Sequence, residues 1–143
     1  LGVGLDLLPA IIFLVAAFIG FAMGTSWGTI ALILPIIIGV FDAADPLFLV
    51  AVGSALAGAV YGDHISPISD TTILSSAGAK CNHLRHVATQ IPYATLVMIV
   101  CFVGYVIAGF TKSPWISLAL GVALIVIAVL VLTRMEASKK AKA

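Results

Sequence analysis

The chain has 143 residues, of which 62% are hydrophobic and only 9% are charged, with a formal net charge of +1. A soluble domain is closer to about 25% charged. The mean hydropathy of +1.25 and the long apolar stretches indicate a membrane protein instead. The small net charge, and the lack of a basic patch interleaved with aromatic residues, exclude nucleic-acid binding as a working hypothesis.

The first ten residues, LGVGLDLLPA, contain no initiator Met. They have neither the basic segment nor the small-residue cleavage site of a signal peptide. We therefore expect the chain to begin inside a larger membrane protein.

The first apolar stretch covers residues 7–40 and is interrupted by GTSWGT, Gly24 to Thr29. One uninterrupted helix of this length would be about 50 Å long, whereas the hydrocarbon core is about 30 Å thick. The interruption leaves pieces of roughly 17 and 11 residues, and the second is too short to span. This pattern predicts a re-entrant hairpin over 7–40 with its tip at GTSWGT. Two distorted spans are the alternative.

The second apolar stretch, 47–79, follows the acidic linker FDAADP and contains the densest polar cluster of the chain, YGDHISPISDTTILSS. We predict a broken helix over 47–79, whose first half ends near Tyr61 and Gly62. Pro67 blocks continuation of that half, and Ser69 or Asp70 can cap a second half beginning near Thr71. A plain extramembrane loop is the alternative, but the eight or so residues after it would be too few to span.

Two further stretches, 91–110 and 115–133, each have the length of one membrane span. Ser113 and Pro114 in the connecting turn suit the start of the second of these helices. Lys80 and Arg85 precede the pair, and four further basic residues lie in the tail 134–143. Because two spans separate these basic segments, they share a side. The positive-inside rule predicts that this side, with the C-terminal tail, is cytoplasmic.

The two interruptions indicate a binding site. Irregular backbone at membrane depth occurs where protein or a water-filled cavity surrounds it, and paired interrupted helices mark the substrate site of secondary transporters. The second interruption supplies hard oxygen ligands suited to Na+: the carboxylates of Asp63 and Asp70, and the hydroxyls of Ser66, Ser69, Thr71 and Thr72. An aspartate at the bilayer centre costs about 2.5–3.5 kcal/mol on insertion scales, and neither interruption contains Lys or Arg. A bound cation or proton is the expected partner.

This chemistry suggests an exchange mechanism. Burial favours the protonated form of a carboxyl group, while a nearby cation favours the ionised form. One site can therefore hold Na+ or a proton alternately. His64 could move protons near neutral pH, or it could simply bond the broken backbone. The hydroxyls of Thr25, Ser26 and Thr29 are weaker candidates, since a turn between two short helices would also explain the first interruption.

Other polar residues receive plainer interpretations. Cys81, His83 and His86 form C-x-H-x-x-H, which matches no common zinc pattern, so we expect a solvated loop. Cys81 lies in that loop and Cys101 in an apolar stretch, so both are expected to be free thiols. Small residues along the second stretch predict close helix packing: Gly53, Gly58 and Gly62.

At GTSWGT followed by GDHISPISDTTILSSAGA, the sequence resembles the NhaC-type Na+/H+ antiporters of the ion-transporter superfamily. The resemblance covers essentially the whole chain, as the C-terminal part of the transporter domain. It implies an all-α multi-pass carrier of the bacterial cell membrane, built from two inverted repeats, of which this chain is the second. In such carriers each half pairs a re-entrant hairpin with a broken helix. Relatives exchange Na+ or H+ against malate and lactate, or carry amino acids.

The resemblance also implies which residues contact the ion. These are Asp63, Ser66, Ser69, Asp70 and Thr71 in the second motif, and Thr25, Ser26 and Thr29 in the first. The implied partners are Na+ and H+ as transported ions, a small organic anion or amino acid in some relatives, the lipid bilayer and the N-terminal half of the transporter. A homodimer is left open, and no cofactor is expected.

We therefore expect a secondary active transporter that exchanges Na+ for H+ at a midplane site, and no enzymatic activity. A Na+- or H+-coupled antiporter of an organic solute is the first alternative. An intramembrane aspartyl protease is a distant one. YGD, Tyr61 to Asp63, is similar to the Gly-x-Gly-Asp element of that group, but Val60 stands at the first Gly position and no second YD motif follows. A cation channel would require a ring of acids from several subunits.

Overall fold

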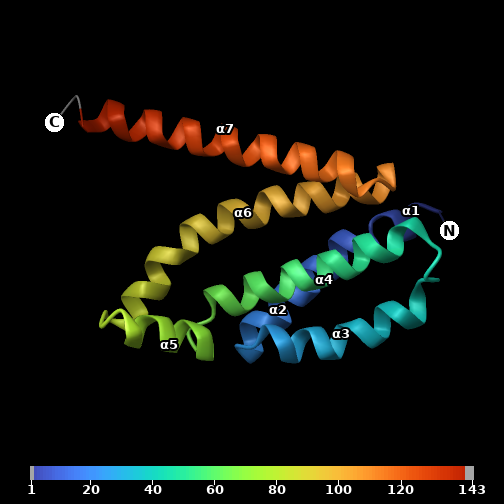
Figure 1. Ribbon diagram of the computed structural model, residues 1–143, viewed down its shortest axis with the longest axis horizontal. Coiled ribbons are helices and arrows are strands. Elements are labelled where there is room, and N and C mark those ends of the chain that lie inside the picture. The colour runs from blue at the N-terminus through green and yellow to red at the C-terminus, as the bar shows by residue number, and fades with distance from the viewer. Residues whose placement is uncertain (1, 141–143) are drawn as a thin grey trace.

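The computed structural model describes residues 2–140, which form seven helices and no strands (Figure 1). The helices are α1 (Gly2–Asp6), α2 (Leu8–Met23), α3 (Ser26–Val40), α4 (Pro46–Ile65), α5 (Asp70–Gly78), α6 (His83–Thr111) and α7 (Pro114–Lys140). Three segments are long and apolar enough to cross a membrane: α4, α6, and Trp115–Arg134 within α7. The apolar helices α2 and α3 are shorter. The protein is thus an all-α membrane protein.

Helices α2 and α3 are joined by a turn of only two residues, and α3 runs back beside α2 (Figure 1). Gly24 ends α2 in the left-handed region at φ 64°, which glycine adopts without steric cost. Thr25 then caps α3, its hydroxyl accepting from the N–H of Gly28 at 3.3 Å. Because this cap starts α3 at Ser26, most of the segment predicted as an open tip is already helical. The re-entrant course of this hairpin stays a prediction.

Helix α4 continues to Ile65, one turn beyond the end expected near Tyr61 and Gly62. The break that follows covers residues 66–69, and Ser66 there is extended, at φ −76° and ψ 128°, as the residue before a proline tends to be. Ser69 caps α5, its hydroxyl accepting from the N–H of Thr72 at 3.4 Å. With 20 residues, α4 alone is about 30 Å long. The depth of the break in the bilayer stays a prediction.

The most extensive packing between two helices joins α2 and α4. Gly58 lies against the backbone of Phe13, and Gly62 lies against the backbone of Ala17. These two glycines fulfil the predicted small-residue face, whereas Gly53 faces α6 instead. The hydrophobic core lies next to this contact, between α2, α3 and α4, and contains Ala16, Ile33, Ile37, Phe41, Leu47, Ala51 and Ala55.

Helices α6 and α7 pack on the outside of this unit (Figure 1). Helix α6 begins at His83 rather than at 91, because Asn82 caps it by accepting from the N–H of Arg85 at 3.0 Å. It bends along its length in Figure 1 and contains Pro92, which removes a backbone donor from the helix. Helix α7 continues through the expected basic tail as far as Lys140. Only 17% of the α6 span and none of the α7 span is buried, so their apolar faces remain for lipid or other protein.

Candidate functional site

The two interruptions, far apart in sequence, meet in space. The hydroxyl of Ser66 in the α4–α5 break donates to the carbonyl of Phe21, in the last turn of α2, at 2.8 Å. Gly24 in the α2–α3 turn lies so close to Ile68 that an added Cβ would come within 2.9 Å of its backbone. We call residues 24–25 and 66–69 together the break junction. It lies at one end of the α2–α4 pair (Figure 1).

Asp63 lies in the last turn of α4, directly before the break junction, and is only 6% exposed. Its main-chain carbonyl accepts from the N–H of Ser66 at 3.1 Å. Its side-chain Oδ1 is buried and has no hydrogen-bond partner within residues 2–140. A buried charged oxygen without a partner is costly. A proton or a cation at this oxygen would remove that cost.

Asp70 lies in a different environment. It is exposed in the first turn of α5, and its Oδ1 accepts from the N–H of Thr71 at 2.7 Å. A carboxylate at this position is favoured by the partial positive charge of a helix N-terminus. The two aspartates, expected from the sequence to act together, therefore differ. Asp63 is buried, and its Oδ1 has no hydrogen-bond partner among the described residues, whereas Asp70 is exposed and already accepts a hydrogen bond.

Most of the predicted hydroxyl ligands brace the backbone around the break junction. Ser66, Ser69, Thr72 and Thr29 are buried, Thr25 and Ser26 are half-buried, and Thr71 is exposed. Ser69 and Thr71 share a hydrogen bond of 2.8 Å between their hydroxyls. Thr72 donates to the carbonyl of His64 at 3.5 Å, and Thr29 donates to the carbonyl of Thr25 at 2.8 Å. A hydroxyl that donates in this way keeps oxygen lone pairs free to accept.

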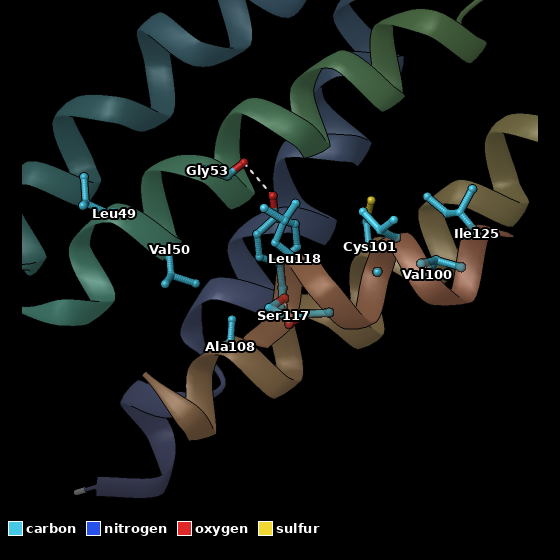
Figure 2. A pocket seen from close by; sticks show the side chains of 13 residues that line it. Leu49, Val50, Gly53, Val100, Cys101, Ala108, Ser117, Leu118 and Ile125 are labelled. Atoms are coloured by element: carbon cyan, nitrogen blue, oxygen red, sulfur yellow. Dashed lines mark hydrogen bonds between the residues drawn. The ribbon is translucent and has the colours of Figure 1, made fainter. Parts of the chain in front are cut away.

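Two cavities lie beside α4, and neither is lined by an acid. One, of about 750 Å³, lies between α4 and α6, and its mostly apolar wall includes Tyr61, Tyr93 and the exposed His64. The other, of about 400 Å³, lies between α4, α6 and α7 (Figure 2). Tyr105 in that second wall donates its hydroxyl to the carbonyl of Gly53 at 2.9 Å, the dashed line in Figure 2.

His83 contacts the break junction, although the sequence suggested only a loop residue. Its Nε2 lies 2.7 Å from the carbonyl oxygen of Pro67, and its Nδ1 lies 3.1 Å from the hydroxyl of Ser76. The other histidine of the C-x-H-x-x-H pattern, His86, instead bonds Gln90 within α6. No group of three metal-ligating side chains gathers within the part of the chain that the structure describes. The spacing between Pro67 and His83 fits no helical or strand period, so no local signal could have predicted this contact.

Residues 5–110, which include both interruptions, match the family described as the Na+/H+ antiporter family. The chain belongs to this family. Its family is one of membrane transporters rather than enzymes, which argues against the protease alternative. No solved structure is significantly similar to the chain.

Curated relatives of this antiporter family member are several times longer than the chain. An uncharacterized protein of Haemophilus influenzae is 51% identical over 110 residues, covering 76% of this chain and 21% of that protein. A malate-2H(+)/Na(+)-lactate antiporter of Bacillus subtilis is 34% identical, covering 75% of the chain and 24% of that protein. An uncharacterized Na(+)/H(+) antiporter of Haemophilus influenzae is 36% identical, covering 56% of this chain and 17% of that protein. The chain thus spans about a sixth to a quarter of the length of these relatives.

Proposed function

We propose that the chain belongs to a carrier that exchanges Na+ for H+ across the bacterial cell membrane, and that Asp63 holds the two ions alternately. The observation that carries this proposal is the buried carboxylate of Asp63 beside the break junction, whose Oδ1 has no hydrogen-bond partner among the residues that the structure describes. Membership of the Na+/H+ antiporter family supports the choice of ions.

The surrounding groups suit a small hard cation. Hydroxyl and carbonyl oxygens are the ligands that such ions prefer, and the break junction concentrates them beside Asp63. Ser66 and Ser69 would contribute from the α4–α5 break, and Thr72 from the first turn of α5. Thr25 would contribute from the α2–α3 turn, and Ser26 and Thr29 from the start of α3. Asp70 and Thr71, being exposed, would attract the cation at the entrance rather than bind it in the interior.

Competition between the two ions follows from the burial of Asp63. A bound proton removes the charge that Na+ needs, and bound Na+ stabilises the ionised form. Each ion therefore displaces the other. Exchange across the membrane results when the site opens to each side in turn, without any covalent step and without a cofactor.

A second candidate function, exchange that includes a small organic anion, has a specific observation in its favour. The cavity of about 750 Å³ beside α4 carries His64, Tyr61 and Tyr93 on an otherwise mostly apolar wall. These three side chains can hydrogen-bond a carboxylate, and one relative is described as a malate-2H(+)/Na(+)-lactate antiporter.

The decisive experiment uses everted membrane vesicles from a bacterium that lacks its own antiporters, carrying the transporter at its full natural length. The vesicle interior is acidified, and a pH-sensitive dye is followed as NaCl is added. Wild type is compared with Asp63→Asn and Asp70→Asn. The matched control is Asp42→Asn, which alters an exposed acid in the linker between α3 and α4.

We expect Na+ to collapse the pH gradient in wild type and in the Asp42 control. Asp63→Asn should abolish the response, and Asp70→Asn should raise the Na+ concentration needed for it. A response to malate or lactate but not to Na+ alone would select the organic-anion function instead. An Asp63→Asn protein that is inserted normally and exchanges like wild type would disprove the role of Asp63.

A further inference from the structure

We propose that His83 is a positioning residue, which fixes the shape of the α4–α5 break from the start of α6. Its two ring nitrogens contact two different elements: Nε2 approaches the carbonyl oxygen of Pro67 at 2.7 Å, and Nδ1 approaches the hydroxyl of Ser76 in α5 at 3.1 Å. One side chain therefore joins the break, α5 and α6.

The chemistry of the two contacts defines the bonds. A carbonyl oxygen can only accept a hydrogen bond, so Nε2 carries a proton and donates a hydrogen bond to the carbonyl oxygen of Pro67. Ser76 is only 2% exposed, and its hydroxyl also lies 2.8 Å from the carbonyl of Ile73. The hydroxyl of Ser76 has a single proton. It therefore donates to Nδ1 when that nitrogen is unprotonated, and to the carbonyl of Ile73 when Nδ1 carries a proton of its own. The ring is thus bonded at both nitrogens.

The backbone that carries the His83 ring is also fixed. His83 is the first residue of α6, and Asn82 caps that helix. The preceding turn is tied back to α5, because the N–H of Cys81 donates to the carbonyl of Ser76 at 3.0 Å. The end of α5, the turn and the start of α6 therefore form one braced corner, from which the imidazole reaches the break.

Pro67 stands between the two residues of the break that contact α2 and the α2–α3 turn. Ser66 on one side bonds the carbonyl of Phe21, and Ile68 on the other packs on Gly24. Fixing the carbonyl of Pro67 fixes the peptide plane that joins Pro67 to Ile68. His83 thereby sets how the break lies on the α2–α3 turn, beside Asp63. Its effect on transport rests on the proposed function, whereas its effect on the break does not.

The test compares three substitutions in the full-length transporter. Gln can place an amide donor near the position of Nε2, whereas Asn, one methylene shorter, reaches only the position of Nδ1. Ala removes both contacts. The variants are therefore His83→Gln, His83→Asn and His83→Ala. The matched control is His86→Ala, since among the contacts described the side chain of His86 bonds only to Gln90 of the same helix.

Two readouts separate positioning from general stability. The first is deuterium uptake by a peptide covering residues 62–79 in purified protein. The second is the Na+ concentration for half-maximal exchange, compared with the maximal rate. We expect His83→Asn and His83→Ala to speed uptake in that peptide and to raise the half-maximal Na+ concentration about tenfold, as for loss of one hydrogen bond. The maximal rate should stay within about twofold. His83→Gln and His86→Ala should resemble wild type in both.

The proposal is overturned if His83→Asn matches wild type in both readouts, or if His83→Gln is as impaired as His83→Asn. If His83→Ala does not accumulate in the membrane, the Gln and Asn pair still decides. If wild type shows no response to Na+, the proposed function fails. Deuterium uptake then decides alone: faster uptake in His83→Asn but not in His83→Gln supports the positioning role, and equal uptake overturns it.

Discussion

Within the described part of the chain, Oδ1 of Asp63 is buried without a hydrogen-bond partner, so loss of the Asp63 charge should not destabilise the fold. Asp63→Asn removes a buried charge and should leave the melting temperature unchanged or higher. Na+ should raise the melting temperature of wild type, because a ligand that binds only the folded state stabilises it, and this shift should be lost in Asp63→Asn. Thermal unfolding of the full-length protein in detergent, with and without Na+, measures both effects.

Asp70→Asn is the control for that prediction. It removes a favourable charge at the start of α5, which costs about 0.3–1 kcal/mol, so the melting temperature should fall slightly. The Na+-dependent shift should persist. A shift that disappears in Asp70→Asn and persists in Asp63→Asn would reverse the roles assigned to the two acids.

Ser66 makes the side-chain bond across the break junction, so its hydroxyl should matter more than that of an exposed serine. Ser66→Ala leaves the carbonyl of Phe21 without this donor and should lower the free energy of unfolding by about 1–3 kcal/mol. Ser75→Ala, in the neighbouring helix, removes only an exposed bond to the carbonyl of Thr71 and should change it by less than about 0.5 kcal/mol. An equal decrease in the free energy of unfolding of the two variants would show that the hydrogen bond from Ser66 to Phe21 does not contribute to stability.

At the scale of single residues, the candidate site residues could be predicted from the sequence, but their burial and hydrogen-bond partners could not. The density of acids and hydroxyls around Pro67 marked the break correctly, since each residue type there disfavours a continuous helix. The contrast between Asp63 and Asp70 could not be predicted, because it depends on α4 continuing one turn further than expected. The contact of His83 with Pro67 could not be predicted either, because it depends on how the chain folds between α5 and α6.

At the scale of elements, the α2–α4 contact depends on glycines that let two backbones approach closely. Gly62→Ala would place a methyl group against the backbone of Ala17 and Phe21, and backbone cannot move aside as a flexible side chain can. We expect a loss of about 1–3 kcal/mol or more in the free energy of unfolding, with less folded protein in the membrane. Fluorescence-detected size-exclusion chromatography and thermal unfolding measure this.

Gly39→Ala is the matched control, because nothing lies within 4 Å of the added methyl group. Alanine replaces glycine there within α3, so the free energy of unfolding should rise by about 0.4–1 kcal/mol. A Gly62→Ala protein as stable as wild type would show that α2 and α4 can separate without loss.

Helix existence was predictable here, while helix ends and contacts were not. Apolar length indicated the spans, and Gly24 and Pro67 indicated the interruptions. The ends moved because capping residues fix them locally: Thr25 starts α3 early, and Asn82 starts α6 well before residue 91. The meeting of the two interruptions depends on a main-chain oxygen of Phe21. Every residue has such an oxygen, so the sequence does not indicate which one will be used.

At the scale of the whole molecule, two free cysteines offer a test of orientation. Cys81 is exposed in the α5–α6 turn, and Cys101 is half-buried in the apolar part of α6. If the basic side is cytoplasmic, as the positive-inside rule predicts, a membrane-impermeant maleimide should label Cys81 in everted vesicles and not in intact cells. Cys81→Ser is the control, and it should remove that labelling. Labelling of Cys81 in intact cells would place the turn outside.

The close α2–α4 packing also bears on the order in which the chain is made. The short helices α2 and α3 leave the ribosome before α4, the first helix of the chain that is long enough to span. Until then, α2 lacks its contacts with Gly58 and Gly62 of α4, and Gly24 in the α2–α3 turn lacks its contact with Ile68, which follows α4. The α2–α3 hairpin therefore makes these contacts only after α4 and the break have been synthesised, and a ribosome that pauses between residues 40 and 65 delays them.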